Sequence, residues 1–199
     1  MQFRLGLLTG LASLCMAADL GRGVEKFNAR DYAGAESELR AVVAAEPENV
    51  EALRVLGLAL ERQGKNHDAL PFLEKAAQTA PDSAAVKLAQ AGAYAGEKQY
   101  DKASELVDAA AAQQGDNPEL PYYRGMLAVL KKQHKEAVPL LEAAIRHDPD
   151  NAYAHYYAGL AYSNTKRPDK MVEAFSNFLR LEPKAPEAAK VRSFLKSSR

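Results

Sequence analysis

The 199-residue chain has no tryptophan, a single cysteine and no excess of charge of either sign, because 26 lysines and arginines balance 26 aspartates and glutamates. This balance leaves no basic face for nucleic acid or anionic lipid, so neither is expected as a partner. One cysteine cannot form a disulfide within the chain, so its stability must come from packing. No segment has the two-residue alternation of a β-strand. The chain is therefore expected to be all-α.

The N-terminus differs in composition from the rest of the chain. One positive charge, Arg4, precedes an almost wholly uncharged apolar run over residues 5–16. A membrane-spanning helix needs about 20 apolar residues, so this run is too short to cross a bilayer comfortably. A charged start, a short apolar run and small residues after it are typical of a signal peptide. We expect cleavage between Ala17 and Ala18, export to the periplasm or secretion, and no stable membrane insertion of the mature chain.

Two other fates of the N-terminus stay open. Cys15 could carry a lipid as the first mature residue of a bacterial lipoprotein. Such signals resemble one another in having Gly, Ala or Ser directly before the cysteine, whereas this chain has Leu14. The segment could also stay uncleaved and anchor the chain to a membrane. In the favoured reading, residues 1–17 are a signal peptide that is absent from the mature protein.

Three columns of residues repeat every 34 positions along the chain. The first column is rich in proline and consists of Pro47, Pro81, Gly115, Pro149 and Pro183. The second column is small and consists of Gly23, Gly57, Ala91, Gly125 and Gly159. The third column consists of Ala35, Ala69, Ala103, Ala137 and Met171. Because the three columns agree in phase, the chain is built from internal repeats.

Each repeat is expected to hold two helices. In the second repeat, apolar residues three and four positions apart predict an amphipathic helix over residues 50–63. Another helix is expected over residues 69–79, after a cap at Asn66 and before Pro81. The small residues of the columns let the two helix backbones approach each other. No repeat buries both of its faces alone, so the repeats must stack into a solenoid.

This pattern resembles the tetratricopeptide repeat, whose residue types stand here at Leu56, Gly57, Leu60, Ala69, Leu73, Ala76 and Pro81. The resemblance implies a right-handed superhelical solenoid of about five helix-turn-helix repeats over residues 18–185. Residues 186–199 are expected to form a capping helix and a tail. In the last repeat Met171 and Phe178 replace small residues, so its second helix is expected to pack against the capping helix.

No group of residues suggests catalysis, a cofactor or a metal site. The histidines lack the spacing of three or four residues that places two imidazoles on one helix face, and they stand at His67, His134, His147 and His155. The glycines are dispersed along the helices, unlike those of a phosphate-binding loop. We therefore expect a protein that is not an enzyme and that needs no cofactor.

The resemblance implies that the first helix of each repeat lines a concave groove that binds another protein. The lining positions expected to bind the partner are Arg54, Leu58, Leu88, Tyr122, Met126, Tyr153, Tyr156 and Leu160. In the fourth and fifth repeats these residues are aromatic and apolar, and rigid aromatics with a polar tip are common anchors. The expected function is an exported scaffold or adaptor that holds a peptide or helix of a partner. The alternative is a passive assembly or spacer module that self-associates.

Overall fold

The structure of the protein is a computed structural model that describes residues 19–197. Its helices are α1 (Leu20–Asn28), α2 (Tyr32–Ala45), α3 (Val50–Arg62), α4 (Asn66–Thr79), α5 (Ala84–Gly96), α6 (Tyr100–Gln113), α7 (Leu120–Leu130), α8 (His134–His147), α9 (Ala152–Asn164), α10 (Pro168–Leu181) and α11 (Ala188–Ser197). No strand occurs in this part of the chain, so the prediction of an all-α solenoid is confirmed. The predicted signal peptide and Cys15 lie outside the described residues.

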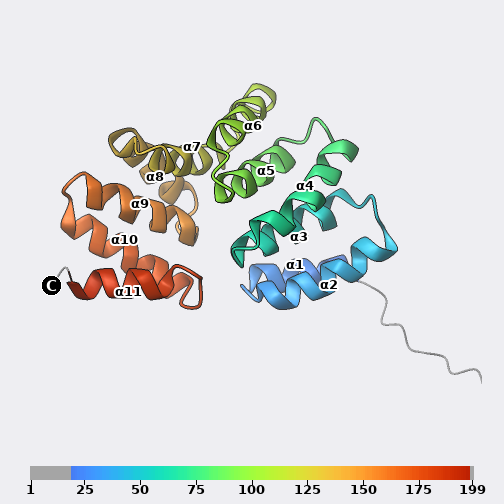
Figure 1. Ribbon diagram of the computed structural model, residues 1–199, viewed down its shortest axis with the longest axis horizontal. Helices are drawn as coiled ribbons and strands as arrows, with labels where there is room; N and C mark the ends of the chain where they lie inside the picture. The colour runs from blue at the N-terminus through green and yellow to red at the C-terminus, as the bar shows by residue number, and fades with distance from the viewer. Residues whose placement is uncertain (1–18, 198–199) are drawn as a thin grey trace, which may run out of the picture.

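The helices pack as five hairpins, α1 with α2 through α9 with α10, and α11 follows the last hairpin. Figure 1 shows the hairpins side by side in an arch that runs from α1 to α11. The first helices of neighbouring hairpins also contact one another in the order α1, α3, α5, α7 and α9. These odd-numbered helices line the inner side of the arch, and the second helices cover the outer side.

Polar caps begin the first helices at the repeat period. The side chains of Asn49, Ser83 and Asn151 accept hydrogen bonds from the backbone N–H three residues later, at 3.0, 3.3 and 3.0 Å. Such caps satisfy backbone donors that the helix itself leaves without a partner. Each capping residue follows a residue of the proline column by two positions, so proline stops one repeat and the cap starts the next.

The prediction of Asn66 as a cap is wrong. Asn66 is the first residue of α4, and Lys65, at the N-cap position, makes no side-chain cap. The helix therefore starts three residues earlier than expected. The amide of Asn66 instead packs against the next repeat, because a Cβ built on Gly96 would lie 2.3 Å from Asn66 Cγ.

The glycine column brings the two helices of a hairpin together. A Cβ built on Gly57 would lie 2.4 Å from Cγ of Leu73, a residue of α4 that is fully buried. The same close approach joins the other glycines of the column to a side chain 16 positions later, in the pairs Gly23 with Leu39, Gly125 with Leu141 and Gly159 with Phe175. In the third repeat the column holds Ala91, and the residue 16 positions later is Val107, which is smaller than the Leu or Phe of the other repeats.

A fourth column has positive φ and ends the first helix of every hairpin. Its members are Arg30, Gly64, Lys98, Lys132 and Lys166, with φ of 63°, 76°, 61°, 64° and 58°. The left-handed conformation turns the chain sharply after a helix. Because this turn recurs in each repeat, all five hairpins have the same local geometry.

The last repeat departs only partly from the expected packing. Phe175 of α10 contacts Phe194 of α11 with ring centroids 5.8 Å apart, as a helix packed on the capping helix would. Phe178, however, points into its own hairpin and meets the rings of Tyr153 at 5.8 Å and Tyr156 at 5.1 Å. The large side chain at position 178 therefore fills space beneath α9.

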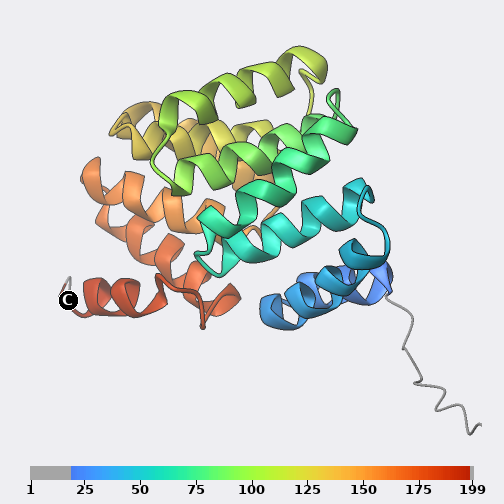
Figure 2. The ribbon, with the colours of Figure 1, turned by 45° about the vertical axis from the view of Figure 1, so that its right-hand side comes forward.

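The two ends of the arch meet. In both views of the ribbon, the end of α10 lies beside the turn between α1 and α2 (Figure 1, Figure 2). Arg30 of that turn and Glu182, which follows α10, form an ion pair of 2.8 Å across 152 positions of sequence. The array is thus a nearly closed ring in which the terminal repeats touch.

Candidate functional site

The eight residues predicted to bind a partner all lie on the inner helices α3, α5, α7 and α9. Five of them are buried, with exposed fractions of 9% or less, and these are Leu58, Leu88, Tyr122, Met126 and Tyr153. Arg54, Tyr156 and Leu160 are partly buried. The inner face is therefore not an open groove in this structure, and its role in partner binding stays a prediction.

Tyrosines from α7 and α9 form an aromatic cluster on the inner face. The rings of Tyr122 and Tyr157 lie 6.4 Å apart, and those of Tyr153 and Tyr156 lie 6.2 Å apart. Burial raises the pKa of Tyr122 to about 12, and burial together with the nearby charge of Glu187 raises the pKa of Tyr156 to about 12. Both hydroxyls therefore stay neutral at physiological pH and can donate hydrogen bonds.

A charged pair stands inside the arch at the end of α3. The guanidinium carbon of Arg62 lies 4.5 Å from the ring centroid of Tyr153, so the second repeat touches the fifth. Arg62 Nη1 is 3.7 Å from Glu61 Oε1, which is too long for a hydrogen bond. Glu61 Oε2 is buried without a hydrogen-bond partner, and burial raises the pKa of this carboxyl. The pair places opposite charges in the interior with weak mutual stabilisation.

The fold makes room for this carboxylate at a glycine of the neighbouring repeat. A Cβ built on Gly92 of α5 would lie 2.9 Å from Glu61 Oε2. Any side chain at this position would have to displace Glu61. Gly92 therefore makes room for a side chain of the neighbouring repeat, whereas the glycine column brings the two helices of one hairpin together.

The terminal repeats meet at Glu182, Arg30 and Tyr32, none of which was predicted to bind a partner. Glu182 is buried, and its Oε1 accepts hydrogen bonds from Arg30 Nη1 at 2.8 Å and from the Tyr32 hydroxyl. Glu187 Oε2 accepts a hydrogen bond of 3.2 Å from the hydroxyl of Tyr153. Glu187 and Tyr153 lie at the same end of the arch, so this bond adjoins the contact between the repeats. We call these five residues the terminal contact. Tyr153 was predicted on the inner face. The other sequence signal of this contact is the place of Arg30 in the positive-φ column, and nothing near Arg30 in the sequence indicates its partner.

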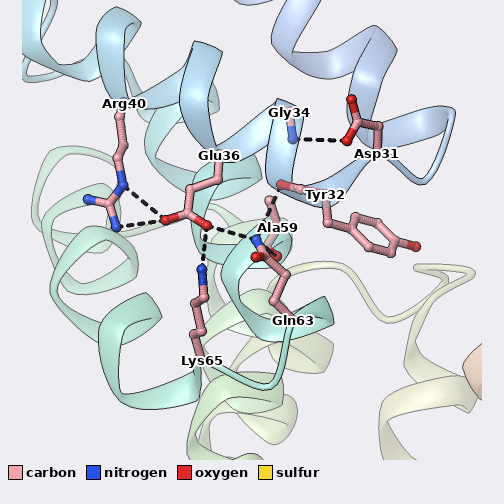
Figure 3. Close-up of polar contacts among 8 residues, drawn as sticks. All are labelled: Asp31, Tyr32, Gly34, Glu36, Arg40, Ala59, Gln63 and Lys65. Atoms are coloured by element: carbon pink, nitrogen blue, oxygen red, sulfur yellow. Dashed lines mark hydrogen bonds and ion pairs between the residues drawn. The ribbon is translucent and has the colours of Figure 1, made fainter. Parts of the chain in front are cut away.

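The start of α2 fixes the position of Tyr32. Asp31 caps this helix, since its Oδ1 accepts a hydrogen bond of 3.0 Å from the N–H of Gly34. Figure 3 shows the Tyr32 ring pointing away from the polar side chains around it. The Tyr32 hydroxyl therefore bonds to none of these polar side chains and donates instead to Glu182, which follows the last repeat helix α10.

A network centred on Glu36 ties the same segment to α3 (Figure 3). Its carboxylate accepts hydrogen bonds from Arg40 Nη2 at 3.0 Å, Gln63 Nε2 at 2.9 Å and Lys65 Nζ at 2.8 Å. Gln63 Nε2 also donates to the carbonyl oxygen of Tyr32 at 3.2 Å. The first and second repeats are thereby locked together beside the terminal contact, and Tyr32 is held in place by its backbone.

Two cavities adjoin the terminal contact. One has a volume of about 280 Å³, and its wall includes Asn28, Arg62, Asp148 and Asp150. The other has a volume of about 590 Å³, and its wall includes Gln63 and Lys184. Arg30, Tyr32 and Glu182 line both cavities. Solvent therefore reaches the terminal contact, although Glu182 itself is buried.

A second carboxylate with the same kinds of partner lies elsewhere in the fold. Glu142 Oε1 accepts hydrogen bonds of 2.9 Å from both the Tyr162 hydroxyl and Lys170 Nζ. These residues belong to consecutive helices α8, α9 and α10 and join adjacent repeats. The local chemistry matches that of Glu182 with Tyr32 and Arg30, but here it connects neighbours along the array.

Neither a metal site nor a membrane-spanning helix is found among the described residues. Within residues 19–197, no group of three or more His, Cys, Asp or Glu side chains is placed to hold a metal ion. His155 of α9 contacts the carbonyl oxygen of Pro149, at the end of the preceding repeat, through Nε2 at 2.9 Å. No helix in the same range has both the length and the apolar character needed to cross a membrane.

Solved structures with a similar fold are repeat proteins. TTC0263, a thermophilic TPR protein of Thermus thermophilus, matches with a TM-score of 0.68 at 18% identity, over 90% of this chain and 96% of that one. MamA from Desulfovibrio magneticus RS-1 matches with a TM-score of 0.52 at 26% identity, over 75% of this chain and 82% of that one. At 18% identity the first likeness concerns the fold alone. No curated protein matches the chain in sequence.

Sequence models of the tetratricopeptide repeat match most of the described residues. One model covers residues 20–84 and 124–186, and a second covers residues 60–130. These matches agree with the 34-residue period, the helix hairpins and the packed glycine column. The chain therefore belongs to the tetratricopeptide repeat family.

Proposed function

We propose that the chain is an exported scaffold that binds another protein through the inner face of its repeat array. The observation that carries the proposal is the aromatic cluster of Tyr122, Tyr153 and Tyr156 on consecutive inner helices. Buried tyrosines with neutral hydroxyls suit the anchoring of a peptide or helix, because they offer large contact area and a hydrogen bond at low entropic cost. The proposal includes no catalytic step.

Access to this cluster requires the arch to widen. Tyr156, Leu160 and Arg54 are partly exposed and offer a first contact in the closed arrangement. In a solenoid each repeat packs only on its neighbours, so a small rotation at every interface changes the width of the whole arch. A wider arch would expose Tyr122 and Tyr153 to the partner without unfolding any hairpin.

The test compares partners captured by the full chain and by a Tyr122→Ala/Tyr156→Ala variant, identified by mass spectrometry. We expect the double variant to lose a partner that the native chain retains. Tyr100→Ala is the matched control, since Tyr100 lies at the start of α6, outside the inner helices. Unchanged capture by the double variant, with an intact helical circular dichroism spectrum, would sink the proposal.

Export is part of the proposal and rests on the composition of residues 1–17. N-terminal sequencing of the protein from fractionated cells should find Ala18 at the start of the mature chain. A mass increment of a lipid on Cys15 would assign a lipoprotein instead. An intact N-terminus in the membrane fraction would assign an uncleaved anchor.

Self-association is a second candidate, favoured by one observation. Phe194 of the terminal helix α11 is 41% exposed, and Val172 of α10 is 43% exposed. Exposed apolar side chains at the end of a solenoid suit stacking of copies. Light scattering during size-exclusion chromatography should then show an oligomer that Phe194→Ser disrupts, and a monomer at all concentrations would reject this candidate.

A further inference from the structure

The segment that follows α10 contacts the first two repeats. Residues 182–187, which we call the linker segment, connect α10 to α11. Glu182 accepts hydrogen bonds from Arg30 and Tyr32 of the first repeat, and Glu187 accepts one from Tyr153 of the fifth repeat. Pro186 of this segment lies beside the turn after α3, because a Cβ built on Gly64 would be 3.9 Å from Pro186 Cγ. The segment therefore spans the gap between the last repeat and the first two.

The contact that closes the ring depends on side chains. Among the described residues, no backbone hydrogen bond joins the first two repeats to α10, α11 or the linker segment. Helix packing connects each hairpin only to its neighbours in the array. The terminal repeats can therefore separate while every hairpin keeps its own core, and the linker segment then stays on the fifth repeat, against whose core Ala185 packs.

The surface that receives the linker segment is made of hydrogen-bond donors. Arg30 and Tyr32 converge on one carboxylate oxygen, and Tyr153 serves a second carboxylate. Charge-assisted bonds of this kind are stronger than neutral ones. Asp148 and Asp150 line the adjoining cavity, where they disfavour further negative charge.

We propose that this donor surface binds an acidic segment of a partner protein, and that the linker segment is a built-in competitor that occupies it in the free chain. The fitting occupant carries two carboxylates spaced as Glu182 and Glu187 are, separated by a proline-containing turn. The inference rests on the proposed function, since it names the chemistry of the partner that opens the inner face.

Competition within one chain is strong because the competitor is tethered. A segment joined by a short connection has an effective concentration on the order of millimolar. A separate partner molecule must compete with this effective concentration. Its apparent affinity is the intrinsic affinity multiplied by the fraction of chains that are open. Displacement of the linker segment would separate the terminal repeats and uncover the aromatic cluster behind them.

The first experiment supplies the segment in trans. The probe is a synthetic peptide with the sequence of residues 181–187, and the receptors are the native full chain and its Glu182→Gln/Glu187→Gln variant, followed by NMR titration. The variant keeps all donors but loses its own carboxylates. We expect it to bind the peptide at least about tenfold more tightly than the native chain. Equal affinity, or no shifts at Arg30, Tyr32 and Tyr153, would overturn the proposal.

Two controls isolate the acidic groups. A peptide with both glutamates replaced by glutamine should bind neither chain. A Glu142→Gln variant loses the same kinds of hydrogen bond, from Tyr162 and Lys170, but away from the terminal contact. It should bind the acidic peptide as weakly as the native chain, and tight binding by this variant would count against the assignment.

A second experiment measures closure without any partner. Spin labels at Asn28→Cys and Lys184→Cys, in the full chain with Cys15→Ser, report the distance across the terminal contact by pulsed electron resonance. We expect a single short distance in the native chain, and a longer, broader distribution when Glu182→Gln/Glu187→Gln is added. An unchanged distribution shows that these carboxylates do not close the ring and overturns the competitor role.

The outcomes separate this inference from the proposed function. A ring that opens while the peptide does not bind would reject the acidic partner and leave the scaffold role standing. Peptide binding with no effect of Tyr122→Ala/Tyr156→Ala on partner capture would reject the proposed inner-face site alone. A concentration-dependent dimer of the native chain that Glu182→Gln abolishes would assign the surface to a second copy and overturn the proposal.

Discussion

The guanidinium of Arg62 lies 4.5 Å from the ring centroid of Tyr153, so side chains of the second and fifth repeats meet in the middle of the arch. An open solenoid would leave these residues on facing walls with solvent between them. Their contact closes the inner face at this point, while Leu58, Leu88 and Met126 are buried in the hydrophobic clusters between the repeats. The interior of this short array is filled by its own side chains, and Arg62 carries a charge into it beside Glu61.

Replacing Arg62 should be costly because Glu61 would be left alone in the interior. For Arg62→Ala we expect a loss of about 3 kcal/mol in the free energy of unfolding, the usual cost of a buried charge that loses its counter-ion. Adding Glu61→Ala should recover part of this loss, and urea unfolding of the two single variants and the double variant gives the coupling. Additive effects of the two substitutions would show that the charges do not interact.

Much of the fold could be predicted from the sequence, because a 34-residue period fixes contacts within a repeat and between neighbours. The glycine column predicted the close approach that Gly57 makes to Leu73. The terminal contact was beyond such reasoning. Small rotations between successive repeats add up over the array, and only their sum brings Arg30 to Glu182. The burial of Tyr122 depends on the same sum, so the sequence placed it on the inner helix but not in an enclosed interior.

A methyl group at Gly57 should destabilise the second hairpin. Alanine favours the helix by about 1 kcal/mol, but the added Cβ would overlap Leu73, and overpacking a buried contact costs about 1–3 kcal/mol. We expect Gly57→Ala to lower the melting temperature. Adding Leu73→Val should restore part of it, since Ala91 stands with Val107 at the equivalent positions of the third repeat. A higher melting temperature for Gly57→Ala alone would contradict the packing argument.

Glycine at the positive-φ column should stabilise the chain. Lys132 is exposed and has φ of 64°, a conformation that strains a residue with a Cβ. We expect Lys132→Gly to raise the free energy of unfolding by about 0.5–1 kcal/mol, after the extra flexibility of glycine in the unfolded chain is subtracted. Chemical denaturation measures the change. Lys135→Gly, in the first turn of helix α8, is the control and should destabilise the protein by at most about 1 kcal/mol.

The Glu36 network should make the stability depend on pH. Burial alone would raise the pKa of Glu36, but hydrogen bonds from Lys65, Gln63 and Arg40 outweigh it and hold the pKa below its ordinary value. A carboxyl with a lowered pKa in the folded state stabilises the protein above its unfolded pKa, and this contribution is lost as the pH falls through the folded pKa. Glu36→Gln should therefore cost about 1 kcal/mol near pH 7 and little near pH 3, by urea unfolding. Glu48→Gln, on the exposed turn before α3, removes the same charge without a network and should change the stability at neither pH. An equal loss of stability for Glu36→Gln at both pH values would show that the glutamine destabilises the protein through its geometry. The charge of Glu36 would then not hold the first two repeats together.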